Sequence, residues 1–257
     1  MSAHFLLSGR WVVRHVLAFV VIASCIALAI WQVQRLQDRR AENRRLEAQS
    51  QHPVTQLETL LQSLADPREG EYRRVEVRGA YDVGHEVVLR SRSFEERPGN
   101  HLLTPLRAGR TAIVVDRGWV PIEIGTPGAP QALPPAGEVG VVGTLLPSEG
   151  RDVLGVSDPP PGDVDSLPRI DLDRLQEQLP YEIAPLYLQL QSQEPAGGSL
   201  PEVVPLEPLS DGPHFEYALQ WSFFALAAIV VYAALIRKEL RRRRPEDDAS
   251  DAAPASA

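Results

Sequence analysis

Two long apolar segments near the two ends of this 257-residue sequence constrain its fold more than any other feature. They cover residues 11–31 and 215–236 and contain few polar residues. Each is long enough for a helix that crosses a hydrocarbon layer about 30 Å thick. Tryptophan or tyrosine lies near the ends of both segments, as is typical at a lipid–water boundary. The sequence therefore predicts two terminal transmembrane helices.

Two other interpretations of these segments are weaker. A pair of buried core helices is one, but a soluble domain rarely places two such segments at opposite ends of its chain. A cleaved signal is the other, because Ile22 to Cys25 resembles a lipoprotein cleavage box. The apolar run continues beyond Cys25 and then meets Trp31, whereas a mature lipoprotein turns polar at once. We therefore expect the first segment to be an uncleaved anchor.

The positive charges near the segment ends predict the orientation in the membrane. Six cations lie within residues 237–244, directly after the second segment. Five arginines also follow the first segment, and because two spans put both termini on one side, the two cues conflict. Acidic residues are mixed with these five arginines, which weakens the first cue. Because the second segment has the larger asymmetry, we expect a multi-pass protein of the cell membrane with both termini, 1–10 and 237–257, in the cytoplasm. The acidic end of the tail, from Pro245 onward, is expected to be disordered.

The chain between the segments is expected to form one extracytoplasmic domain. Residues 32–66 have the composition of a helical juxtamembrane segment, and residues 67–214 read as mainly β. Leucines within 54–64 follow the spacing of an amphipathic helix, for which Thr55 and Glu58 would form a capping box.

Six strand-like runs follow, and they predict an antiparallel sheet or a small barrel in an α+β domain. Gly140 and Gly143 would permit a bulge or tight curvature in the fifth run. A long surface loop is expected over 147–168, and a short helix over 171–179. The runs cover residues 72–81, 85–92, 101–106, 111–120, 138–146 and 185–191.

Composition excludes several classes of function. The formal net charge of −8 argues against a nucleic-acid binder, which usually has a basic face. The single cysteine, Cys25, excludes disulfide scaffolds, zinc ribbons and CxxC redox pairs. No nucleophile motif, phosphate-binding loop or paired metal ligands appear, so we expect no enzyme. The alternative is an envelope enzyme that uses acidic groups of the loop. No acid–base pair that would support it is recognisable in the sequence.

Three groups of residues are candidates for function. Asp116 and Arg117 are neighbours on a strand, so they face opposite sides and each needs its own partner or water. A strand-to-turn junction fixed by arginine hydrogen bonds and a packed Trp119, or else a contact with a partner protein, would explain them. Around Trp31, Gln32 and Arg35, ordinary membrane anchoring and a contact with a carboxylate-bearing ligand both stay open. His214, Tyr217, Ala218 and Trp221 would share one stripe of a helix, where a neutral imidazole can ligate haem iron. Interfacial histidines and aromatics are common, however, so the residues alone favour simple anchoring.

Taken together and in this order, these groups resemble the surfeit locus protein 1 family of cytochrome c oxidase assembly factors. The resemblance spans nearly the whole chain. The matching fragments are Trp31-Gln32-x-x-Arg35, Gly79-x-Tyr81-Asp82, Glu86 to Arg92, Leu103-Thr104-Pro105-Leu106, Val115 to Pro121 and His214-x-x-Tyr217-Ala218-x-x-Trp221.

This resemblance implies a role in building the haem a–containing subunit of a terminal oxidase. By similarity, His214 is the favoured axial ligand of the haem a iron, flanked by Tyr217 and Trp221. Arg35 is the hypothetical partner of the propionates. The implied partners are the haem-bearing subunit, the haem a synthesis enzyme and membrane lipid, and no nucleic acid. The alternative is a membrane scaffold that clasps the nascent subunit without binding haem.

Overall fold

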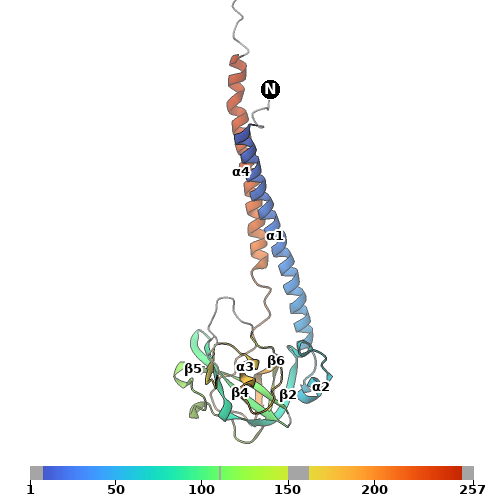
Figure 1. The fold of residues 1–257 in the computed structure, drawn as a ribbon, viewed down its shortest axis with the longest axis vertical. Helices are drawn as coiled ribbons and strands as arrows, with labels where there is room; N and C mark the ends of the chain where they lie inside the picture. The colour runs from blue at the N-terminus through green and yellow to red at the C-terminus, as the bar shows by residue number, and fades with distance from the viewer. Residues whose placement is uncertain (1–7, 110, 150–161, 251–257) are drawn as a thin grey trace, which may run out of the picture. The chain divides into compact units, whose positions relative to one another are not determined.

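The computed structural model divides the chain into two compact units (Figure 1). The helical unit comprises residues up to Asn43 and from Leu209 onward, and the sheet unit comprises Arg44–Pro208. The structure describes residues 8–109, 111–149 and 162–250, and for 243–250 the backbone only. Residues 1–7 of the expected N-terminal segment 1–10, most of the expected loop and the last seven residues lie outside the described ranges.

Each apolar segment forms one long helix. These helices are α1, Gly9–Ser50, and α4, His214–Ser250. Both are long and apolar enough to cross a membrane, with mean hydropathies of 2.5 and 2.0 over their most apolar windows. Only 11% and 6% of those windows is buried, which disagrees with core helices of a soluble domain. The two terminal helices are therefore confirmed as helices.

The two helices pack antiparallel along a seam. Buried and half-buried residues recur along each helix at alternating spacings of three and four residues, the pattern of a coiled-coil seam. Hydrogen bonds join residue 15 to residue 232 and residue 32 to residue 214, so the helices run in opposite directions. The seam contains Trp11, His15, Ala18, Ile22, Cys25, Ala29, Gln32 and Leu36 from α1, and His214, Ala218, Trp221, Ala225, Ala228 and Tyr232 from α4.

Both helices extend beyond their apolar parts. As expected, α1 continues through the polar stretch 32–49. In the structure α4 extends to Ser250, past Pro245 where disorder is expected. The charged residues before Pro245 favour helix and continue α4 beyond its apolar part.

The helix at the start of the sheet unit is shorter than the stretch 54–64 expected for it. It is α2, Leu57–Ser63, which is preceded by the short strand β1, Thr55–Gln56, and followed by the 3₁₀ turn η2, Pro67–Gly70. The capping box of Thr55 and Glu58 is wrong: Thr55 pairs with Val75 in the sheet, and its hydroxyl donates to the Pro53 carbonyl at 3.2 Å. Strand pairing therefore uses the backbone that the cap would have needed.

All six strand-like runs form strands. β2 is Arg74–Tyr81, β3 Val87–Phe94, β4 Arg97–Ala108, β5 Thr111–Pro121, β6 Glu138–Leu146 and β8 Tyr187–Glu194. The connections contain the 3₁₀ turns η3 Val83–His85, η4 Ile122–Ile124 and η5 Pro130–Ala132, the strand β7 Ser166–Leu167 and the helix α3 Leu172–Gln176. The short helix expected within 171–179 is confirmed as α3.

Five of these strands close into a small barrel. The order β2-β6-β8-β5-β4 returns to β2 because Ala80 and Tyr81 also pair with Arg107 and Leu106 of β4. All neighbours in this ring are antiparallel except β5 and β8, which are parallel. β1, β3 and β7 extend the sheet outside the ring. The structure thus selects the barrel from the two expected sheet forms and adds one parallel pair.

The barrel interior holds the largest apolar cluster of the sheet unit. Alternate residues of its strands, among them Val75, Leu106 and Leu188, are fully buried there, and α2 contributes Leu57 and Leu60. At Gly143 a side chain would not fit, because an added Cβ would lie 2.3 Å from the Gln189 carbonyl oxygen of β8. The register of β6 against β8 shifts between Val142 and Gly143, so the predicted irregularity is confirmed at this glycine.

Candidate functional site

The start of α4 carries the strongest candidate site. Pro213 precedes the helix, and its carbonyl accepts the first helical hydrogen bond, from Tyr217 N at 3.1 Å. His214 is the first residue of the helix, directly after this proline. The segment before it is held to α1, because the Asp211 carboxylate accepts from Arg40 Nε at 2.9 Å and from Asn43 Nδ2 at 3.1 Å.

A hydrogen bond across the seam fixes the His214 ring. Its Nδ1 lies 2.8 Å from Oε1 of Gln32 on α1, and Gln32 is only 8% exposed. An amide oxygen accepts and does not donate, so Nδ1 carries the proton and donates it to Gln32. The lone pair of the neutral ring then resides on Nε2, which is the atom that a metal ion would meet.

Glycine at position 212 leaves room beside that nitrogen. Gly212 has a φ of +69°, in the left-handed region that favours glycine. A Cβ added at this position would lie 3.6 Å from His214 Nε2 and 3.5 Å from Cδ2. Any other residue would therefore place a methylene or methyl group against Nε2. The site thus combines one oriented imidazole with a preceding glycine that places no side chain against its Nε2.

The structure divides the expected aromatic stripe of α4 between two faces. Ala218 is buried in the seam and Trp221 is half-buried, so these two residues share the face of His214. Tyr217 is 46% exposed and lies outside the seam. Trp221 packs edge-on against Phe224, with ring centroids 5.7 Å apart. Of the two expected flanking rings, only Trp221 therefore stays with His214.

Arg35 lies on α1, one helical turn beyond Gln32. It is exposed, and it makes no ion pair within the described part of the chain. The neighbouring Arg40, by contrast, is paired with Asp211. Arg35 is therefore an available cation close along the helix to the residue that holds His214.

Gln32 is the site residue that sequence reasoning did not single out. It was part of the motif around Trp31 and Arg35, but a polar residue at the end of an apolar segment is common. The signal that would have found it is its position in the alternating three- and four-residue spacing, where the other seam residues of α1 near it are Ala29 and Leu36. A glutamine at a seam position requires a polar partner on the facing helix.

A second polar cluster lies buried in the sheet unit. The Glu86 carboxylate accepts from Arg117 Nη1 at 3.0 Å, from Thr104 Oγ1 at 2.5 Å and from Gly128 N at 2.9 Å. Arg117 also donates to the Ala132 carbonyl at 2.7 Å. Burial lowers the pKa of Arg117 below its ordinary value, and the carboxylate of Glu86 opposes this shift. Because the cluster bonds to the backbone of Gly128 and Ala132, it positions the loop after β5.

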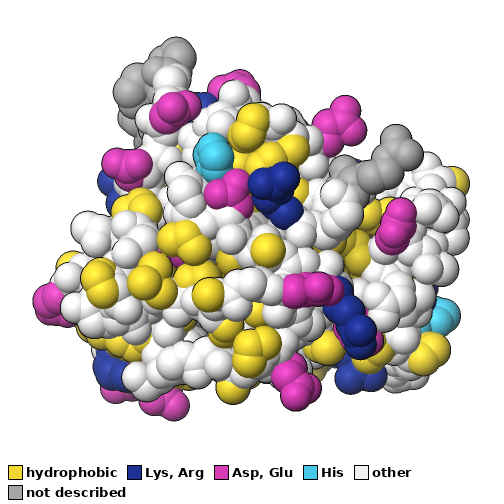
Figure 2. Space-filling model, turned by 90° about the horizontal axis from the view of Figure 1, so that it is seen from below, with side chains coloured by type: hydrophobic (Ala, Val, Ile, Leu, Met, Phe, Trp, Pro, Cys, Tyr) yellow, Lys and Arg dark blue, Asp and Glu magenta, His cyan; other side chains and the backbone are white. Residues whose placement is uncertain are grey.

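Asp116 has a separate partner, as expected. Its carboxylate meets His101 Nδ1 at 2.9 Å and accepts from Gly118 N at 3.0 Å. Trp119 is buried, and its Nε1 donates to the Arg92 carbonyl at 3.2 Å. Asp116 and Arg117 thus point to opposite sides of β5 and act as structural residues of the sheet unit. Figure 2 shows acidic and basic side chains interspersed over the face that it draws.

Comparison with known protein families gives a match over most of the chain. The model of the SURF1 family matches residues 19–226, which is about four fifths of the chain. The match includes the start of α4, the end of the apolar part of α1 and the whole sheet unit. No curated protein matches the chain.

Proposed function

Because this chain belongs to the SURF1 family, an assembly-factor family associated with cytochrome oxidase, we propose that it holds haem a and delivers it to a terminal oxidase. The recipient is the haem-bearing subunit of that oxidase, and the haem a synthesis enzyme is the donor. The chain itself catalyses no bond change in this proposal. It binds, orients and releases the haem.

The proposal places both helices in the cell membrane and the sheet unit outside the cytoplasm. Two antiparallel spans bring both termini to one side of the bilayer. The cations that follow the apolar part of α4, Arg237, Lys238 and Arg241 to Arg244, favour the cytoplasm for that side. His214, at the other end of α4, then lies near the outer surface of the membrane.

The single observation that carries the haem proposal is the hydrogen bond between His214 Nδ1 and Gln32 Oε1. It holds the imidazole in the tautomer whose Nε2 is free to bind iron, and an acceptor on the far ring nitrogen increases the basicity of a metal-binding histidine. Gly212 places no side chain beside Nε2. When bound, haem a supplies the electron-transfer chemistry that the finished oxidase uses.

The surroundings of His214 suit a flat amphiphile at a membrane surface. Ala218 and Trp221 provide apolar surface along α4, and Arg35 offers a guanidinium that pairs with carboxylates such as the haem propionates. His214 is one ligand, and the described residues contain no cluster of three or more metal-binding side chains. His214 as the single protein ligand, at a half-buried position, would favour release to the recipient subunit.

An absorption spectrum of the full chain tests this function. The protein is purified after coexpression with the haem a synthesis enzymes, and the haem content of the wild type is compared with His214→Ala. We expect the wild type to carry haem a and the variant to lose most of it. The matched control is His52→Ala, which removes an exposed histidine and should leave the haem content unchanged. Absence of haem from the wild type, or equal content in His214→Ala, would overturn the proposal.

One observation favours a second function, that of a scaffold that clasps the nascent subunit without touching haem. Tyr217 lies outside the seam and offers its ring to a partner instead of covering His214. Under this function, His214→Ala would support oxidase maturation as well as the wild type does, while the subunit copurifies with both. Tyr217→Ala would then weaken that copurification.

A further inference from the structure

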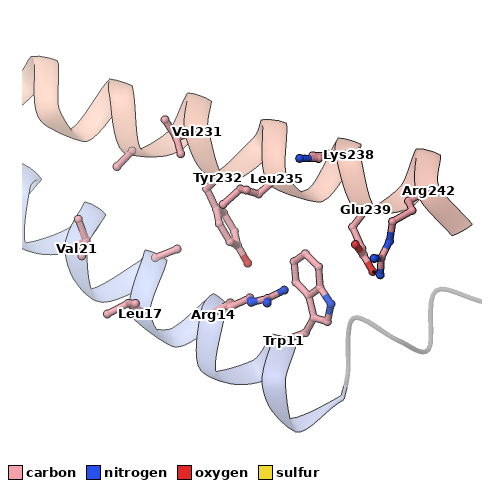
Figure 3. A pocket seen from close by; sticks show the side chains of 12 residues that line it. Trp11, Arg14, Leu17, Val21, Val231, Tyr232, Leu235, Lys238, Glu239 and Arg242 are labelled. Carbon is pink, nitrogen blue, oxygen red and sulfur yellow. Dashed lines mark hydrogen bonds and ion pairs between the residues drawn. The ribbon is translucent and has the colours of Figure 1, made fainter.

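A groove lies at the end of the helical unit that is remote from His214. It is formed by the first turns of α1 and the apolar end of α4, and it has a volume of about 650 Å³ (Figure 3). This volume lies in the range of small-molecule sites. We call it the basic groove. Its lining residues on the apolar walls are Leu17, Ala18, Val21, Ala228, Val231 and Leu235.

The side chains at the mouth of the basic groove are mainly cationic. Arg14 from α1 and Lys238 and Arg242 from α4 line it, together with the carboxylate of Glu239. Arg242 donates to Glu239 at 3.0 Å, so this carboxylate already has a cation beside it. Arg14 lies over the Trp11 ring, 4.9 Å from its centroid, which holds the guanidinium at this end of the groove. Among the described residues that line the groove, cations from both helices therefore outnumber the one carboxylate.

The side chains between the two helices are held by contacts within the seam. The Tyr232 hydroxyl meets His15 Nδ1, and the His15 ring lies against Trp11 with centroids 5.9 Å apart. Figure 3 shows Tyr232 and Trp11 reaching into the space between α1 and α4. Ala18 and Ala228 are small, so the walls leave room beside these rings. The groove is thus a preformed apolar channel with a positively charged mouth.

We propose that the basic groove binds one anionic phospholipid. Its phosphate lies at Arg14 and Lys238, and one acyl chain follows the apolar walls toward Val21 and Val231. A phosphate supplies the negative charge that the mouth lacks, and an acyl chain matches the apolar walls, so the ligand is an amphiphile with an anionic head. Anionic lipids are enriched in the cytoplasmic leaflet. Basic pockets between membrane helices on that side bind the head groups of such lipids.

Native mass spectrometry of the full chain tests this site. The protein is released from nanodiscs of phosphatidylcholine that contain a minor fraction of phosphatidylglycerol, and retained lipid is identified. We expect selective retention of phosphatidylglycerol. The variant Arg14→Gln/Lys238→Gln should weaken it, by about fivefold for each cation removed. The conservative variant Arg14→Lys/Lys238→Arg should retain the lipid.

The matched control is Arg10→Gln/Arg237→Gln. It removes the same number of cations from the same ends of α1 and α4, at positions that do not line the basic groove. Equal loss of lipid in this control would overturn the proposal, because diffuse charge would then explain the binding. Equal retention of phosphatidylcholine would also overturn it. So would retention of inorganic phosphate alone in place of a lipid. The variant Ala228→Phe fills the groove with a larger side chain. It should lower lipid retention while the helix content stays unchanged.

Discussion

At the residue scale, His214 depends for its orientation on one acceptor. Gln32 is the only side chain whose hydrogen bond to this ring is found among the described residues. We predict that Gln32→Leu shifts the tautomer equilibrium of His214 and lowers haem retention by about tenfold, as the loss of an outer hydrogen bond does in metal sites. The nitrogen chemical shifts of the His214 imidazole in the haem-free protein measure the first effect independently of haem.

The control for this variant is Gln34→Leu, which changes an exposed glutamine of the same helix. It should leave both the chemical shifts and the haem content unchanged. Identical imidazole shifts in Gln32→Leu and the wild type would show that Gln32 does not set the tautomer. A loss of haem without such a shift would leave His214 as a ligand, but it would show that Gln32 does not act by setting the tautomer.

The buried pair of Glu86 and Arg117 gives a second prediction at this scale. Arg117→Met leaves the carboxylate of Glu86 buried without its cation, which costs about 3–5 kcal/mol of unfolding free energy. The exposed pair of Arg97 and Glu202 joins similar groups at 2.7 Å, but Arg97→Met should cost much less stability because solvent screens that pair. Hydrogen–deuterium exchange of the β4 and β5 amides in the full chain measures both. Equal effects of the two variants would contradict the structural role of Arg117.

At the element scale, the start of α4 depends on backbone geometry as well as on His214. Gly212→Ala forces a Cβ into the left-handed region and places it beside Nε2. We predict lower haem retention for this variant. Gly109→Ala is the control, since Gly109 has a similar φ of +60° but its Cβ would meet no atom within 4 Å. If Gly109→Ala lowers the haem content as much, backbone strain and not crowding of Nε2 is the cause.

The sequence patterns predicted most elements, because local periodicity reports which residues become buried. Alternation predicted β2 and β6 to within two residues, and the apolar runs predicted α1 and α4. The wrong cap at Thr55 has a non-local cause: its pairing with Val75 in the sheet outweighs a local capping box. The parallel pairing of β5 with β8 and the closure through β2 and β4 are equally non-local, so no periodicity within one strand reveals them.

The same distinction applies to the candidate site. His214 was predicted as a site residue from its place before an apolar helix and from the family resemblance. Its partner Gln32 is 182 residues away in the chain, so only the packing of α1 against α4 brings the two together. Tyr217 was expected beside His214, but the seam spacing of α4 passes through Ala218 and leaves Tyr217 outside. A stripe drawn on one helix does not show which of its edges faces the partner helix.

At the scale of the whole molecule, the proposed function requires that both helices cross the cell membrane. Haem delivery at the outer surface, lipid binding at the cytoplasmic side and the position of the sheet unit all depend on this topology. The chain offers a direct way to measure it, because Cys25 is its only cysteine and is buried in the seam. In a Cys25→Ala background, single cysteines can therefore report on which side of the membrane each part lies.

The measurement is labelling with a membrane-impermeant maleimide in sealed right-side-out vesicles, before and after permeabilisation. The reporter variants are Ser8→Cys at the start of α1, Glu58→Cys on α2 and Leu240→Cys near the end of α4, all of them exposed positions. We predict that Glu58→Cys reacts in sealed vesicles, whereas Ser8→Cys and Leu240→Cys react only after permeabilisation. Protection of Glu58→Cys in sealed vesicles, or reaction of Ser8→Cys and Leu240→Cys without permeabilisation, would contradict the account.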